Sequence, residues 1–126
     1  MHKLLYEYAV VRIVPRVERE EFINAGVVLF CKELKVLKCR THIPIPKLQC
    51  LDSQLNLETL SENLNAFERI ALGKNCPSKI ARLDEPSRFR WLTATRSTIV
   101  QCSKVHPGFA YSLDDVFEGL FQKLVL

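Results

Sequence analysis

The sequence lacks most motifs that announce a known chemistry. Its four glycines are far apart and form neither a GxGxxG nor a P-loop phosphate site. No GxSxG motif marks a nucleophilic serine, and none of the five cysteines has the CxxC spacing of a zinc or redox site. We therefore expect no cofactor and no metal.

Long apolar runs are also missing, which bears on location. The longest run, residues 25–31, is far shorter than the ~20 residues that span a bilayer. Glu7 interrupts the region where a signal peptide would need its apolar core. The cysteines are odd in number and lie mostly within or beside apolar runs, as buried reduced thiols do. The expected location is the cytoplasm, without membrane contact.

What is present indicates an ordinary globular domain. A chain of 126 residues has the length of one domain, which buries roughly two thirds of the surface that its unfolded form exposes. Hydrophobic residues make up 48% and charged residues 25%, so disorder is not expected. No repeat or linker divides the sequence, and we expect a single domain over residues 1–126. The net charge is +4, and the basic excess in residues 74–104 favours an anionic partner.

Two β-like runs begin the chain. Residues 4–14 carry apolar side chains on both alternating faces, which is typical of a strand inside a sheet covered on both sides. Residues 22–31 form the second run, in which Gly26 indicates a bulge or a close backbone approach.

A third run, residues 36–43, alternates cleanly between apolar and polar residues. Lys38, Arg40 and His42 share one face, which we expect to meet water.

Two longer segments have the period of amphipathic helices. Residues 57–72 carry leucines and other apolar residues at steps of three and four, with Asn56 as a cap and Gly73 as a left-handed end. Residues 112–125 begin with capping-box spacing and continue as one apolar stripe. A shorter helical turn is predicted over residues 86–92.

The remaining pieces complete the predicted fold. Residues 97–103 are predicted to form a fourth strand, and VHPG at residues 105–108 is predicted to break the chain. The order of elements indicates an α+β domain with two layers, in which two main helices pack on a mainly antiparallel sheet of about four strands.

The charged stretch between the first two strands invites a site hypothesis. Glu18, Glu20 and Glu21 could suggest a metal or an acid, but neighbouring residues in a loop point apart, whereas a hard cation needs converging oxygens. Arg16 and Arg19 can neutralise the same carboxylates. An ion-paired turn is therefore favoured over a metal site.

A second stretch, residues 87–108, mixes arginines with aromatic residues. Arg90 and Arg96 supply planar donors for phosphate or carboxylate, while Trp91 could stack on a base, enter a partner's pocket or plug the core. His106 is the histidine best placed to act as a base, close in sequence to Ser97, Cys102 and Ser103, but no nucleophile motif accompanies it. The residues leave contact surface and core packing both open.

These two stretches carry a family resemblance. YEYAVVRIVPRVEREEFINAGVVLFC, residues 6–31, and RFRWLTATRSTIVQCSKVHPG, residues 88–108, resemble a bacterial domain-of-unknown-function family, number three thousand and thirty-seven. The resemblance implies no reaction, because the family has none assigned. Members are often encoded beside a HipA-like kinase, which implies an accessory or interaction role.

We hypothesise that the two stretches meet in space and bind a partner. The candidate partner-binding residues are Arg16, Glu18, Arg19, Glu20, Glu21, Asn24, Arg90, Trp91, Arg96 and His106. The leading expectation is a small cytoplasmic interaction module that binds another protein, with a HipA-like kinase as the candidate partner. One alternative is a nucleic-acid binder that uses the basic residues 74–104. The other is an enzyme acting on an anionic small molecule, with His106 as its base.

Overall fold

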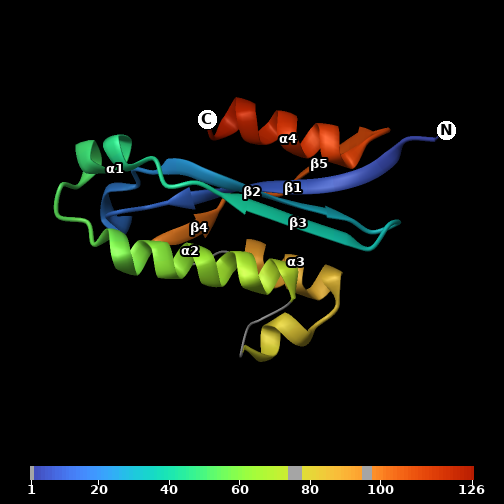
Figure 1. Ribbon diagram of the computed structural model, residues 1–126, viewed down its shortest axis with the longest axis horizontal. Coiled ribbons are helices and arrows are strands. Elements are labelled where there is room, and N and C mark those ends of the chain that lie inside the picture. Colours follow the sequence, from blue (N-terminus) through green and yellow to red (C-terminus); the bar gives the residue numbers. More distant parts are fainter. Residues whose placement is uncertain (1, 74–77, 95–97) are drawn as a thin grey trace.

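The computed structural model describes residues 2–73, 78–94 and 98–126. Its centre is an antiparallel sheet with helices on both faces (Figure 1). The strands are β1 (Leu4–Ile13), β2 (Ile23–Cys31), β3 (Val36–Thr41), β4 (Val100–Cys102) and β5 (His106–Ala110). The helices are α1 (Ile45–Leu51), α2 (Leu57–Leu72), α3 (Glu85–Thr93) and α4 (Leu113–Leu124), with short 3-10 turns at Val17–Arg19 and Lys79–Arg82.

The sheet is organised around β1. Its order is β3-β2-β1-β4, and β5 pairs with β1 on the same side as β4 but nearer the start of that strand. Ala9, Val11 and Ile13 face a core shared with α2 and α3, whereas Tyr6 and Tyr8 pack with α4. The prediction that this strand is covered on both faces is confirmed.

The α+β class and the antiparallel sheet are confirmed, but the layers differ from the expected pair. α4 lies along one face of the sheet, and α2 and α3 lie along the other, so the domain has three layers (Figure 1). The stripe of α4 packs on Val27, Leu29 and Cys31, which are fully buried. Because β2 is apolar on both of its faces, each face requires its own helical cover.

The predicted helix ends are confirmed. The Asn56 side chain accepts a hydrogen bond from the Thr59 amide, and Gly73 closes α2 with a left-handed φ of 71°. The Ser112 hydroxyl accepts from the Asp115 amide at the start of α4. No helix in the described residues is both long and apolar enough to cross a bilayer.

Gly26 makes the close approach that its position predicts. A Cβ at this residue would lie 2.5 Å from the carbonyl oxygen of Arg40 on β3. The adjoining β1–β2 register shifts between Val11 and Arg12, as at a β-bulge. Gly26 therefore lets β2 and β3 approach each other.

The polar face of β3 meets water as predicted, since Arg40 and His42 are exposed, and α4 crosses part of this face. The Arg40 guanidinium carbon lies 4.2 Å from the centre of the Phe121 ring, and Arg40 also pairs with Glu118 at 2.9 Å. Lys38 pairs with Asp114 at the start of α4. The two cations fix α4 across the sheet while their heads stay near solvent.

The predicted chain break at residues 105–108 lies largely within β5. Pro107 and Gly108 occur inside this strand, which pairs with β1 from Tyr8↔His106 to Leu4↔Ala110. A proline is tolerated where a strand lies at the edge of a sheet, so the Pro-Gly pair misled the prediction.

The cysteines yield a labelling prediction. Cys50 is exposed and Cys31 is buried, while burial, followed by the nearby Glu68 and Cys102, raises the pKa of Cys39 well above its ordinary value. Cys76 lies outside the described residues. We expect iodoacetamide to modify Cys50 at least ~10-fold faster than Cys31 or Cys39 in the folded protein, as measured by peptide mass spectrometry. In urea the three rates should converge, and equal rates without urea would contradict these placements.

Candidate functional site

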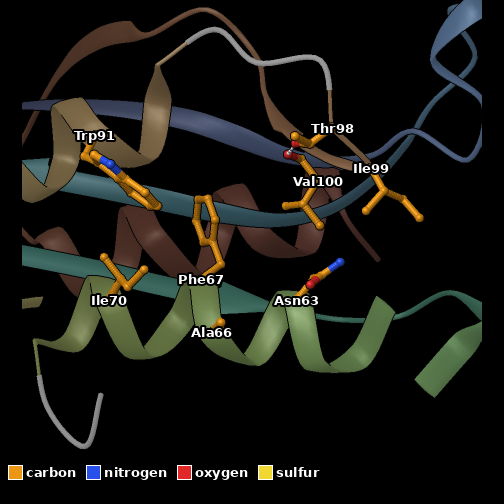
Figure 2. A pocket seen from close by; sticks show the side chains of 8 residues that line it. All are labelled: Asn63, Ala66, Phe67, Ile70, Trp91, Thr98, Ile99 and Val100. Atoms are coloured by element: carbon orange, nitrogen blue, oxygen red, sulfur yellow. Dashed lines mark hydrogen bonds between the residues drawn. The ribbon is translucent and has the colours of Figure 1, made fainter. Parts of the chain in front are cut away.

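An apolar groove lies between α2 and the start of β4 (Figure 2). Its volume is about 270 Å³. Its lining residues are Asn63, Ala66, Phe67 and Ile70 from α2, Trp91 from α3, and Thr98, Ile99 and Val100 from the chain that enters β4. The four α2 residues follow the i, i+3, i+4, i+7 spacing of one helical face, so a single helix forms one whole wall.

Trp91 reaches the groove because its neighbours anchor α3. The Phe89 ring stacks on Phe30 with centroids 5.4 Å apart, and Leu92 is buried. With these two residues in the core, Trp91 is partly buried and points toward Phe67 across the groove (Figure 2). The sequence left open whether Trp91 packs in the core or lies on a contact surface. In the structure one side of Trp91 packs against the core and the other side lines the groove.

The start of α3 is fixed by its cap. The Asp84 carboxylate accepts a hydrogen bond from the Ser87 amide at 3.0 Å, and bonding to Ser87 lowers the pKa of Asp84 from its ordinary value. Arg88 donates to the carbonyl oxygens of Leu83 and Ala71, which ties α3 to the end of α2. The guanidinium of Arg88 is thus engaged inside the fold rather than offered to an anion.

Backbone contacts hold the opposite wall in place. The Val14 amide donates to the Ile99 carbonyl at 2.7 Å, which fixes the chain entering β4 beside the end of β1. The Thr98 hydroxyl donates to the Val100 carbonyl at 2.7 Å (Figure 2). The groove is therefore held by the sheet on one side and by α2 on the other.

The chemistry of the groove suits recognition of an apolar group. None of the described lining residues is charged, and Asn63, Trp91 and Thr98 are the lining side chains with polar atoms. No general acid, general base or carboxylate is available on these walls for bond-making chemistry. The arrangement favours shape and hydrophobic contact.

The charged turn before β2 is largely ion-paired. The Arg19 Nε atom lies 2.6 Å from Glu21, and the Arg16 Nε atom lies 3.7 Å from Asp52 beyond α1. Glu18 and Glu20 are exposed, and no group of three metal-binding side chains occurs in the described part of the chain. The geometry agrees with an ion-paired turn.

Asn24 lies on the other face of the sheet from Trp91. Its side-chain amide donates to the carbonyl of Leu124 at the end of α4, 3.0 Å away. Opposite it on β1, the Arg12 guanidinium carbon lies 4.0 Å from the centre of the Phe22 ring. Asn24 therefore connects the sheet to α4 and does not reach the groove.

His106 is on the α4 side too. Its ring lies 5.3 Å from that of Tyr8, its partner across the β1–β5 ladder. Cys102 packs in the core of the opposite face, and the Ser103 hydroxyl both accepts from the Val10 amide and donates to the Lys104 carbonyl. Neither Cys102 nor Ser103 is positioned as a nucleophile for His106, and Ser97 lies outside the described residues.

The predicted site residues are thus divided between surfaces. Trp91 lines the groove, Arg90 is exposed on α3, and Arg96 lies outside the described residues. Asn24 and His106 face α4, so one concave surface does not collect all ten. Their contact with a partner stays a prediction.

The sequence analysis did not predict that α2 lines a candidate site. Phe67 and Ile70 belong to the apolar stripe of that helix, and a stripe is normally core. One feature of the sequence could have indicated the groove. Asn63 and Ala66 are small or polar residues beside the apolar stripe, and they leave the edge of the stripe open to solvent.

The fold and the groove together define a small α+β domain with an apolar surface groove, built on an antiparallel sheet with helices on both faces. The chain belongs to the family described as protein of unknown function (DUF3037), whose family model matches residues 8–125. Comparisons with curated proteins and with solved structures give no match.

Proposed function

We propose that this domain is a non-enzymatic interaction module whose groove receives an apolar side chain of a partner protein. The observation that carries the proposal is the position of Trp91, partly buried at the mouth of an uncharged groove of about 270 Å³. Tryptophan is enriched among the residues that dominate binding energy at protein interfaces. A cavity of this size fits one large side chain rather than a drug-sized ligand.

The partner in this proposal is another protein in the cytoplasm. The groove offers a binding surface without charge, and charge depletion is typical of the centre of a protein interface. The exposed side chains of Asn63 and Thr98 supply the polar atoms at the edge of the groove. A HipA-like kinase, which the family resemblance suggests, is the first partner to test.

Truncating Trp91 should abolish most of this binding. We expect Trp91→Ala to weaken binding to a purified HipA-like kinase from the same organism about 30-fold, because a hot-spot aromatic contributes about 2 kcal/mol or more. Isothermal titration calorimetry measures the change. Leu72→Ala is the matched control, because Leu72 is exposed on α2 outside the groove lining.

A second variant separates loss of binding from loss of stability, because Trp91 is partly buried and its truncation also removes packing contacts. Ala66 is exposed on α2 and lines the groove, so Ala66→Arg should block the groove while leaving the core intact. Loss of binding in both variants with an unchanged melting temperature for Ala66→Arg supports the proposal. Unchanged affinity in both variants, or no binding by the wild type, rejects the groove as the docking site for this kinase.

A further inference from the structure

A hollow separate from the groove lies between the start of α3 and the turn that joins β2 to β3. Its volume is about 370 Å³, and it shares no lining residue with the groove beside Trp91. Three parts of the chain build it: the end of β2, the turn and the N-terminal end of α3. The lining residues are Phe30, Lys32, Lys35, Asp84, Glu85 and Pro86.

The floor of this hollow is apolar and held in place. Phe30 is 5% exposed, and its ring stacks on Phe89 of α3 with the centroids 5.4 Å apart. Pro86 lies in the first turn of α3, where its ring fixes the backbone. An apolar group inside the hollow would contact the rings of Phe30 and Pro86.

The walls carry charges of opposite sign. Lys32 and Lys35 belong to the β2–β3 turn, which the Lys35 amide closes by donating to the Lys32 carbonyl at 3.2 Å. Asp84 and Glu85 belong to the start of α3. None of the ion pairs among the described residues joins one of these lysines to one of these carboxylates. The cations and the anions therefore line one space without pairing with each other.

The two carboxylates differ in what already occupies them. One oxygen of Asp84 accepts a hydrogen bond from the Ser87 amide, and bonding to Ser87 lowers the pKa of Asp84, so this group is ionised at neutral pH. Glu85 makes no side-chain hydrogen bond or ion pair within the described residues. Because Asp84 already caps the helix, the charge of this wall comes from side chains and not from the amides of α3.

This charge pattern selects a zwitterion. A ligand with only an anionic group would be repelled by the two carboxylates, and a ligand with only a cationic group would be repelled by the two lysines. A neutral apolar ligand would displace water from four charged groups without replacing its hydrogen bonds. An α-amino acid carries an ammonium and a carboxylate on one carbon, so it can pair with both walls while its side chain lies on the floor.

We propose that this hollow binds an α-amino acid with an apolar side chain, whose carboxylate pairs with the two lysines and whose ammonium pairs with the two acidic residues. This inference adds a small-molecule site to the domain and does not depend on the groove. Exposed ion pairs contribute little each, because water and salt screen them. Binding should therefore be weak, with a Kd of about 1–10 mM.

Amide-resolved NMR of the whole chain, titrated with leucine and with phenylalanine, tests the site. At least one of the two should shift the amide signals of the β2–β3 turn and of the start of α3, and the shifts should saturate with a Kd of about 1–10 mM. The N-acetyl derivative lacks the ammonium and the amide derivative lacks the carboxylate, so each should bind at least ~5-fold more weakly. No saturable shift with either amino acid up to ~50 mM, or equal binding of either derivative, overturns the proposal.

Variants without one charge test the two walls separately. Lys32→Gln and Glu85→Gln should each weaken binding at least ~3-fold with an unchanged melting temperature. Glu58→Gln is the matched control for the acidic wall, because Glu58 lies in the first turn of α2 as Glu85 does in α3, and exposed Lys47→Gln on α1 is the control for the basic wall. Wild-type affinity in both wall variants contradicts the proposal. Ala66→Arg should leave amino-acid binding unchanged, so this site and the groove can fail separately.

Discussion

Phe121→Ala should lower the free energy of unfolding by about 3–5 kcal/mol, the usual cost of truncating a buried phenylalanine. Phe121 is 1% exposed and packs with Val27 of β2 and Val125 at the end of α4. Its ring also lies under the guanidinium of Arg40, so truncation removes that contact and leaves a cavity. In the described structure α4 is the single helix on its face of the sheet. The truncation therefore weakens the packing of the one helix that covers this face.

Urea denaturation followed by circular dichroism measures this change. Phe109→Ala is the matched control, because the same substitution at a side chain that is 67% exposed should change the stability by less than about 0.5 kcal/mol. Equal losses in the two variants would contradict the packing of α4 on the sheet.

Gly26→Ala should destabilise the domain by about 3 kcal/mol or more, at the upper end of the overpacking range. The added methyl carbon would lie 2.5 Å from the Arg40 carbonyl oxygen and 3.0 Å from the Thr41 side chain. A backbone oxygen inside a strand pair cannot rotate away as the end of a long side chain can. The β2–β3 ladder must therefore open next to its Gly26↔Thr41 pair.

Gly119→Ala is the control for this substitution, and its effect should have the opposite sign. Gly119 is exposed within α4, and nothing lies within 4 Å of an added Cβ. Alanine in a helix interior is more favourable than glycine by about 0.5–1 kcal/mol, so this variant should be more stable than the wild type. Equal effects of the two substitutions in thermal unfolding would argue against the strand approach at Gly26.

Local signals predicted most of the secondary structure. The caps at Asn56 and Ser112 and the end at Gly73 follow from backbone hydrogen bonding within a few residues, and the structure confirms them. β5 was missed, because Pro107 and Gly108 are turn residues unless a neighbouring strand supplies the pairing. That neighbour, β1, is about a hundred residues earlier in the chain.

The candidate site was predicted only in part. Trp91 was singled out by its residue type, and it does line the groove. The other wall comes from α2 and from residues 98–100, whose positions depend on the Val14–Ile99 hydrogen bond and on the packing of α2. The hypothesis that Asn24 and His106 join Trp91 assumed a single docking face, whereas the sheet lies between them.

For this protein the sequence alone determined the short-range features. These are the positions and caps of the two long helices, the close approach of two strands at Gly26, and a first strand that is covered on both faces. These depend on side-chain alternation and on hydrogen bonds between near neighbours, which the order of residues specifies directly. Only the tertiary structure decided that α4 and α2 take opposite faces, that Trp91 borders a groove and that Leu5 meets Phe109 in the open. Such placements depend on which distant surfaces bury each other, and periodicity states only that a face is apolar, not what will cover it.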